Sequence, residues 1–164
     1  MALADVKAYF KGTELEGKVI ELAESSATVE LAAAALHTEP DRIAKTLSYL
    51  IEDRPILIVA SGLARVDNRK YKDRFHKKAK MIPFDEVNDY IGHLPGGVCP
   101  FATKEGVTVY LDVSLRKYET VFPAAGSGNS AIEMTPAQLE QFAHASEWID
   151  VCQDSVLENR GNGV

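Results

Sequence analysis

Cysteine is scarce in this 164-residue chain, which holds only Cys99 and Cys152. Two cysteines cannot build a disulfide framework, and no C-x-x-C pair or H-E-x-x-H helix supplies ligands with the spacing of a metal site. We therefore expect neither a metal nor another cofactor. The cysteines are interpreted as small buried or half-buried side chains in a reduced compartment.

Long apolar runs are also missing, since no stretch approaches the roughly 20 residues that a membrane span needs. The first twelve residues, MALADVKAYFKG, lack the apolar core and small-residue cleavage site of a signal peptide. These absences predict a cytoplasmic protein that does not contact a membrane.

Signatures of covalent and nucleotide chemistry are absent as well. The sequence has no G-x-S-x-G nucleophile elbow and no Gly-Lys-Ser/Thr ending of a P-loop. Two nucleophile–base pairs are conceivable, Cys99 with a histidine and Ser127 with His93. Pairs of this kind commonly arise by chance. We therefore expect a site that works without a protein nucleophile.

What is present indicates an ordinary globular domain, with 46% hydrophobic and 26% charged residues. The length and the lack of a composition shift predict one domain over 1–157, followed by a frayed tail at 158–164.

Periodicity and capping signals predict an interleaved order of helices and strands. Thr28 and Thr135 are expected N-caps. The expected helices are an opening helix from Leu3 to Phe10, one after Thr28, one opened by Pro40 over 40–47, the basic segment 65–78, 83–90, and a closing helix after Thr135. The expected strands or extended segments are 17–22, 45–51, a central strand over 55–60, 80–82, 107–113, 120–125, 131–134 and 148–151. The spacing is not that of regular βαβ units, so we predict an α+β fold.

Basic residues are concentrated between positions 65 and 80, although the chain as a whole has a net charge of −6. Eight of the 18 basic residues lie there, opposed only by Asp67 and Asp73: Arg65, Arg69, Lys70, Lys72, Arg74, Lys77, Lys78 and Lys80. This basic stripe can guide a polyanion, because charge acts over only about 8–10 Å in salt. A solvated helix face explains it equally well, and the sequence leaves both interpretations open.

Three segments are candidates for chemistry. Lys45 sits among apolar neighbours in Ile43-Ala44-Lys45-Thr46-Leu47 at an expected helix-to-strand junction, where partial desolvation favours catalysis or anion binding. The alternative is a lysine whose stem packs while its head reaches water. The loop at 96–100 begins with Gly96-Gly97, whose amides could stabilise an oxyanion, or which could simply form a tight turn. The small residues of 124–130 could form a floor that a ligand approaches closely.

Taken in order, these motifs resemble the YbaK/prolyl-tRNA-synthetase-associated editing domain family. The matching pieces are TVELAA at 28–33, IAKTL at 43–47, LIVASG at 57–62 with Arg65-Val66-Asp67, GGVCPF at 96–101, LDVSL at 111–115, and AAGS at 124–127 with IEM at 132–134. Each motif is weak alone, but their order and spacing over roughly 15–145 are fairly specific.

The resemblance implies a mixed, strongly curled, barrel-like sheet flanked by helices. It also implies hydrolysis of the ester between a wrong amino acid and the 3′-terminal adenosine of tRNA. Lys45 then corresponds to the family's essential lysine, and Gly96 and Pro100 to the ends of its GxxxP loop. In that mechanism water attacks the ester carbonyl with help from a ribose hydroxyl, while Lys45 holds a phosphate or carbonyl oxygen.

We accordingly expect Lys45, Gly96 and Gly97 to be catalytic. The substrate site is expected to comprise Thr28, Thr46, Val98, Pro100, Ala124, Ala125, Gly126 and Ser127. The tRNA-binding residues are expected to be Arg69, Lys70, Lys77, Lys78 and Lys80. The implied partners are the tRNA acceptor end and, second, an aminoacyl-tRNA synthetase.

The amino acid removed is expected to be small, such as alanine or cysteine, and the tRNA is expected to be that for proline. Some relatives carry polar residues where this sequence has Ala124 and Ala131, and such side chains help to select the amino acid. The alternative function is a non-catalytic module that binds a nucleotide, a tRNA acceptor end or a synthetase.

Overall fold

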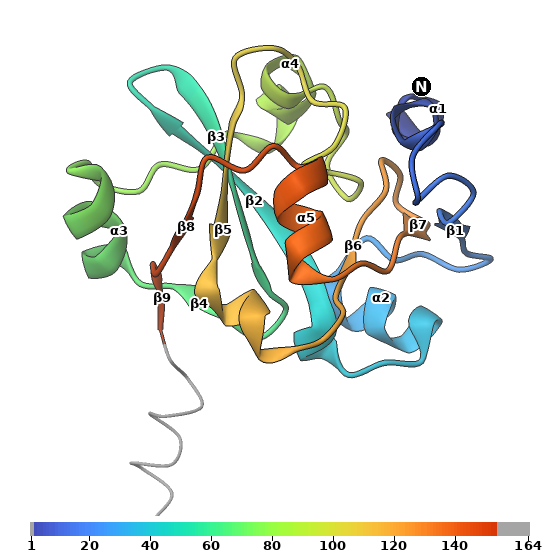
Figure 1. Ribbon diagram of the computed structural model, residues 1–164. Coiled ribbons are helices and arrows are strands. Elements are labelled where there is room, and N and C mark those ends of the chain that lie inside the picture. Colours follow the sequence, from blue (N-terminus) through green and yellow to red (C-terminus); the bar gives the residue numbers. More distant parts are fainter. Residues whose placement is uncertain (1, 154–164) are drawn as a thin grey trace, which may run out of the picture.

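A computed structural model describes residues 2–153 of the chain. It is an α+β fold in which one curled, five-stranded, half-barrel sheet carries helices around it (Figure 1). The α-helices are α1 (Ala2–Phe10), α2 (Val29–Leu36), α3 (Asn68–Phe75), α4 (Val87–Ile91) and α5 (Pro136–Phe142). The short 3₁₀ segments are η1 (Pro40–Arg42), η2 (Phe84–Glu86) and η3 (Val113–Lys117). This confirms the predicted fold class.

The main sheet is mixed, with strand order β6-β2-β3-β5-β8. Its members are β2 (Ile43–Ile51), β3 (Arg54–Ser61), β5 (Thr108–Asp112), β6 (Phe122–Pro123) and β8 (Glu147–Ile149). Only β2 and β3 pair antiparallel, and the other three neighbouring pairs are parallel. Two small antiparallel pairs complete the fold: β1 (Ile20–Glu21) with β7 (Ser130–Ala131), and β4 (Arg65–Val66) with β9 (Cys152–Gln153).

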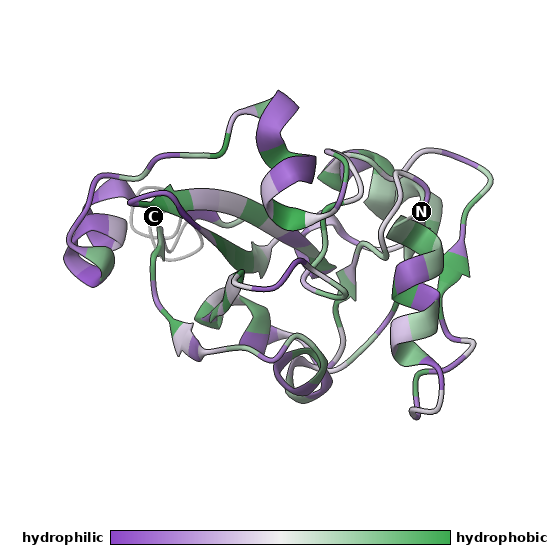
Figure 2. Ribbon diagram, turned by 90° about the horizontal axis from the view of Figure 1, so that it is seen from above, coloured by the Kyte–Doolittle hydropathy of each residue, from purple (hydrophilic) through white to green (hydrophobic). Residues whose placement is uncertain are grey.

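The centre of the sheet is β3, as the apolar run predicts. Leu57, Ile58, Val59 and Ala60 are fully buried, because both faces of the strand are covered. Leu57 and Val59 face the larger core cluster, which α1, α4 and α5 help to close. Ile58 and Ala60 face a second cluster beneath α3. Figure 2 shows the contrast between the largely hydrophobic central strands and the mostly hydrophilic α3.

Capping predictions are confirmed at two helices. The Thr28 hydroxyl accepts a hydrogen bond from the Leu31 N–H at 3.2 Å. Thr135 and Gln138 form a reciprocal capping box at the start of α5, which satisfies two otherwise unpaired backbone donors.

The helix predicted over 40–47 is wrong. Pro40 starts only a single 3₁₀ turn, and Ile43 already belongs to β2. Eight consecutive residue pairs join β2 to β3 through a two-residue turn at Glu52 and Asp53, both with positive φ. Pairing with β3 therefore overrides the local helix propensity of this segment. Lys45 therefore lies inside a strand and not at a helix-to-strand junction.

Other boundaries need smaller corrections. The basic helix covers Asn68–Phe75 and not 65–78, because Asp67 caps its start and His76 ends it in the left-handed region. The strand expected at 120–125 shrinks to Phe122–Pro123, and the one at 131–134 becomes Ser130–Ala131. The last expected strand, 148–151, becomes β8 and β9, separated where the Asp112 carboxylate accepts the Val151 N–H at 3.0 Å. The tail predicted at 158–164 lies outside the described residues. No helix among residues 2–153 is long and apolar enough to cross a membrane.

Candidate active site

A pocket of about 360 Å³ opens at the free edge of β2. Its walls come from the start of α2, from β2, from the β6–β7 region, from residues 81–87 and from the loop at 95–98. The volume is at the lower end of the range for ligand pockets, about 300–1,000 Å³.

The pocket exists because β2 is paired only in part along this edge. β6 pairs with β2 at Ile43 and Ala44 alone. Pairing resumes further along, where the Ile82 N–H donates to the Ser48 carbonyl at 3.1 Å and the Leu50 N–H donates to the Lys80 carbonyl at 2.8 Å. Between these two stretches lies Thr46, on the edge of the strand and in the pocket wall. A substrate can therefore approach strand backbone there.

Lys45 is the cationic group of this wall. Its Nζ donates to the backbone carbonyl of Gly62 at 3.2 Å and to that of Ala64. Burial lowers the pKa of the ammonium below its ordinary value of 10.5, and the nearby Arg65 charge lowers it further. An ammonium has three donors, so two fixed carbonyls leave one for a substrate oxygen.

The turn that supplies these carbonyls is held by Asp41, a buried carboxylate on η1. One oxygen of Asp41 accepts the Leu63 N–H at 3.0 Å. The other accepts Lys117 Nζ at 2.9 Å and the Tyr118 hydroxyl at 2.7 Å. Burial alone would raise the pKa of Asp41, but these hydrogen bonds outweigh it, and the pKa is lowered.

Gly62 fits the same turn closely. A Cβ at this position would lie 1.9 Å from the Pro40 carbonyl oxygen, so the turn packs directly on η1. Asp41 and Gly62 together fix where the Lys45 ammonium sits.

The two glycines of the loop at 94–98 differ in their contacts: Gly97 packs against another loop, and Gly96 lines the pocket. The Gly97 N–H is used within the loop, since it donates to the Leu94 carbonyl at 3.0 Å. A Cβ on Gly97 would meet Ser127 Cα at 2.7 Å, so this residue packs behind the pocket. Gly96 has φ +90° and lines the pocket with Val98. Among the described residues, no backbone acceptor pairs with the Gly96 or Val98 amide.

Six of the expected site residues therefore meet in one pocket: Thr28, Lys45, Thr46, Gly96, Val98 and Ala124. The other five residues expected in the catalytic and substrate sites do not line the pocket: Gly97, Pro100, Ala125, Gly126 and Ser127. Ala125 is fully buried, and a Cβ on Gly126 would meet the Ala2 carbonyl of α1 at 2.8 Å. The Ser127 hydroxyl is 2.6 Å from that of Ser130. This loop supports the Gly96-Gly97 turn from behind.

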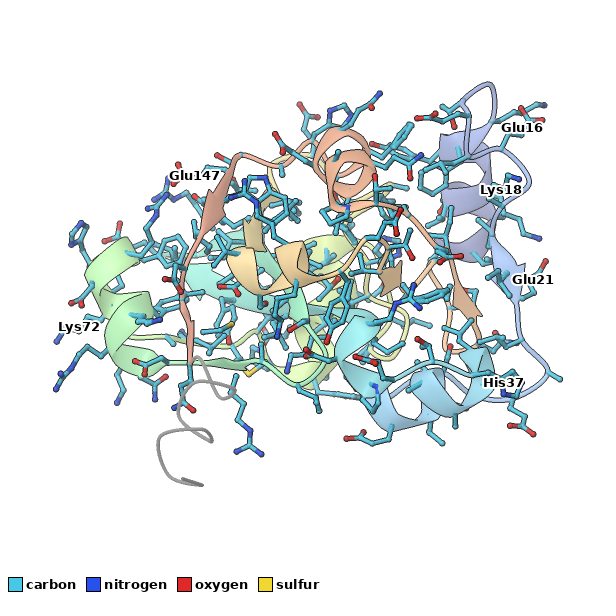
Figure 3. All side chains as sticks on the ribbon, turned by 60° about the horizontal axis from the view of Figure 1, so that its bottom comes forward. Glu16, Lys18, Glu21, His37, Lys72 and Glu147 are labelled. Atoms are coloured by element: carbon cyan, nitrogen blue, oxygen red, sulfur yellow. The ribbon has the colours of Figure 1, made fainter. Side chains whose placement is uncertain are left out.

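The basic stripe is divided between paired and unpaired cations. Lys70, Arg74 and Lys77 form ion pairs with Asp150, Glu147 and Glu52. Within residues 2–153, Arg65, Arg69, Lys72, Lys78 and Lys80 form no ion pair. Figure 3 shows Lys72 pointing away from the body of the protein on the outer side of α3. In Figure 1, α3 lies at the end of the sheet remote from α1 and α2.

The only close cysteine–histidine pair in the described part of the chain is buried away from the pocket. Cys99 Sγ lies 3.6 Å from His93 Nε2, which itself contacts the Phe101 carbonyl at 2.7 Å. Burial raises the pKa of the Cys99 thiol to about 12, so the nucleophilic thiolate does not form near neutral pH. Within residues 2–153 no three His, Cys, Asp or Glu side chains are grouped to hold a metal.

Sequence reasoning missed several residues that shape the site. Met81 and Phe84 line the pocket, and Asp41 holds the Lys45 turn. Because 40–47 is predicted as helix, Asp41 looks like an ordinary acidic residue of a first turn. A strand assignment starting at Ile43 would have separated Asp41 from the helix and marked it as a candidate. Nothing in the sequence signals that Phe84 faces outward.

The comparisons with known proteins agree with this geometry. The aminoacyl-tRNA editing domain family matches residues 23–142, which include every pocket-lining residue. The chain belongs to this family.

Known proteins are similar to this chain both in sequence and in structure. The uncharacterised protein YwhH of Bacillus subtilis (strain 168) is 49% identical over 94% of this chain and 99% of its own length. The proline–tRNA ligase of the same organism is 25% identical over 71% of this chain, which corresponds to 22% of the ligase. A solved structure described as a candidate trans-editing enzyme for prolyl tRNA synthetase has a TM-score of 0.83 and 27% identity, covering 93% of this chain and 97% of that one.

Proposed function

We propose that the protein is a trans-acting aminoacyl-tRNA deacylase. The observation that carries the proposal is the pocket itself, whose lining includes the ammonium-bearing Lys45 and, among the described residues, two backbone amides without a backbone acceptor, those of Gly96 and Val98. These are donors for oxygen atoms, in a family whose members are aminoacyl-tRNA editing domains.

In the proposed reaction a water molecule, assisted by a ribose hydroxyl of the substrate, adds to the ester carbonyl carbon. Negative charge then develops on the carbonyl oxygen, and the Gly96 and Val98 amides are the proposed donors that stabilise it. The bond to the ribose oxygen breaks, releasing the free amino acid and a tRNA with its terminal hydroxyl restored. Lys45 orients the substrate through its remaining N–H, bound to a phosphate or carbonyl oxygen.

The substrate side chain is proposed to be small, with alanine and cysteine the leading candidates. The supporting observation is the alanine-rich wall formed by Ala27, Ala32, Ala44, Ala124 and Ala131. Neither Ala124 nor Ala131 offers a polar group to a polar substrate side chain. The similarity to proline–tRNA ligase and to the candidate trans-editing enzyme supports tRNA for proline as the carrier.

The experiment that tests this function is a panel of tRNAs charged with radiolabelled small amino acids. We expect at least one small amino acid to be released from tRNA for proline faster than by spontaneous hydrolysis. The competing function, a non-catalytic module that binds the acceptor end or a synthetase, predicts tRNA binding with no release from any member of the panel.

A further inference from the structure

Phe84 is the most exposed of the large hydrophobic residues in the described chain, with 79% of its surface accessible. It lines the pocket together with Met81, which is 56% exposed. Single surface hydrophobics need no explanation. Two of them, three residues apart and in the wall of one pocket, form a local apolar surface at its mouth.

This surface is firmly anchored. Lys80 and Ile82 are bonded to the edge of β2 on one side of Phe84. Ile82 and Val87, which bracket Phe84, are both 5% exposed and belong to the main core. Phe84 therefore faces outward from a segment whose backbone is fixed at both ends.

Charges around Phe84 are asymmetric. Lys78 and Lys80 precede it and form no ion pair within the described residues, whereas Asp85 and Glu86 follow it. A phosphate is attracted to the first side and repelled from the second. A nucleotide placed here would set its base on the ring and direct its phosphate toward Lys80.

We propose that Phe84 is a stacking platform for the base of the 3′-terminal adenosine of tRNA, with Met81 extending the apolar surface. This inference rests on the proposed function, because the ester to be cleaved is carried by the ribose of that same nucleotide. Once the ester enters the pocket, its base lies one ribose ring away, at the mouth. Stacking of a base on an aromatic side chain is sequence-tolerant and favourable, which suits a site that must grip any acceptor end.

The test uses a short RNA whose 3′-terminal adenosine is replaced by 2-aminopurine riboside, a base whose fluorescence is quenched by stacking. Four variants are compared with the wild type: Phe84→Ala, Phe84→Leu, Phe84→Tyr and Phe84→Trp. Leucine keeps the apolar bulk but has no flat π-face, so it is the matched control for tyrosine and tryptophan. Binding of the probe is measured alongside KM and single-turnover kcat with charged tRNA.

The alanine and leucine variants are expected to lose the quenching and to raise probe Kd and KM by roughly 5- to 150-fold, while tyrosine and tryptophan stay close to wild type. The rate at saturating substrate should change little. The stacking inference is overturned if the Phe84→Leu variant binds and quenches the probe as the wild type does, or if all four variants quench the probe equally. Either result leaves the deacylase function standing. If the wild type quenches the probe in a Phe84-dependent manner but cleaves no ester, the stacking stands and the deacylase function fails.

Discussion

At the scale of single residues, the site depends on how the Lys45 ammonium is held. The carbonyls of Gly62 and Ala64 fix its position, and burial lowers its pKa. The charged form is the one that can bind a phosphate or carbonyl oxygen. Because the pKa of Lys45 is lowered, its ammonium loses its charge at a lower pH than an ordinary lysine does.

The first prediction concerns this titration. After subtraction of spontaneous hydrolysis, the enzymatic kcat/KM of the wild type should fall at alkaline pH with an apparent pKa below 10.5. Lys45→Arg keeps its charge throughout, so the activity that it retains should show no such fall. Rapid-quench measurements across alkaline pH check this. Parallel profiles for the two proteins would show that another group titrates.

The second prediction concerns Asp41, whose pKa is lowered in the folded protein. A carboxylate with a lowered folded pKa adds stability above its ordinary pKa of 3.8, and this contribution is lost as pH falls through the folded value. Asp41→Asn puts an N–H₂ group opposite the donors Lys117 and Tyr118, which should cost about 1–3 kcal/mol at neutral pH.

Urea unfolding of both proteins from neutral pH into the acid range tests this. The difference in unfolding free energy between wild type and Asp41→Asn should be largest at neutral pH and shrink in acid. A difference that does not change with pH would mean that the carboxylate is not ionised in the fold.

At the scale of elements, the loop at 94–98 is proposed to supply backbone donors to the reacting ester, and the role of Gly96 in this can be tested separately from its role in packing. Gly96→Ala is predicted to lower the single-turnover rate far more than it lowers the melting temperature, because the loss of one oxyanion donor costs on the order of 10²–10³ in rate. Gly106→Ala is the matched control, since Gly106 has φ +91° and open space around its Cβ position, and it does not line the pocket. Both variants bear the same cost of a side chain at positive φ. Equal rates in the two variants would remove Gly96 from the oxyanion site.

The basic stripe is tested at the same scale. Lys72 and Lys78 are exposed and form no ion pair within residues 2–153. Replacing both by glutamine should weaken tRNA binding and reduce the slope of log K against log salt by about 0.7–0.9 for each phosphate that is no longer neutralised. Lys11 and Lys18 give a matched control with the same change in net charge at the α1 end. If the two double variants have the same slope as the wild type, the stripe is only a solvated surface.

The elements also show where sequence reasoning succeeds. Thr28 and Thr135 are predictable because a cap is a local pattern of a few residues. The central strand β3 is predictable because a short apolar run flanked by turns has few other solutions. The helix predicted at 40–47 is wrong because Ile43–Leu47 suits both states, and only pairing with β3 decides between them.

At the scale of the whole molecule, the residues of the candidate site also divide into those that a local sequence pattern predicts and those that only the tertiary fold reveals. Lys45, Thr46, Gly96 and Ala124 are found through motifs whose order is visible in the chain. Asp41, Met81 and Phe84 are not, because their roles depend on segments brought together by the sheet: η1 against the 62–64 turn, and residues 80–84 along the edge of β2. Which side of a loop faces a pocket is set by distant parts of the chain and cannot be obtained from local pattern.

The pocket and the basic stripe, the two surfaces that we propose to contact tRNA, lie apart in the whole molecule. Residues at the start of α2 line the pocket. In Figure 1, α3 lies at the end of the sheet remote from α2. Lys78 and Lys80 lie on the segment that connects α3 to the pocket wall. This arrangement suits a long polyanion that enters the pocket with one end and rests on the basic stripe with its flank.

The most direct measurement of the central claim is the single-turnover rate of deacylation by the wild type and by Lys45→Ala, on tRNA for proline charged with alanine. The wild type is expected to release alanine well above the spontaneous rate. The folded variant is expected to be at least tenfold slower, which is about 1.4 kcal/mol of transition-state stabilisation. A wild type that releases no alanine above the spontaneous rate, or a folded Lys45→Ala variant with unchanged turnover, would contradict the proposed function.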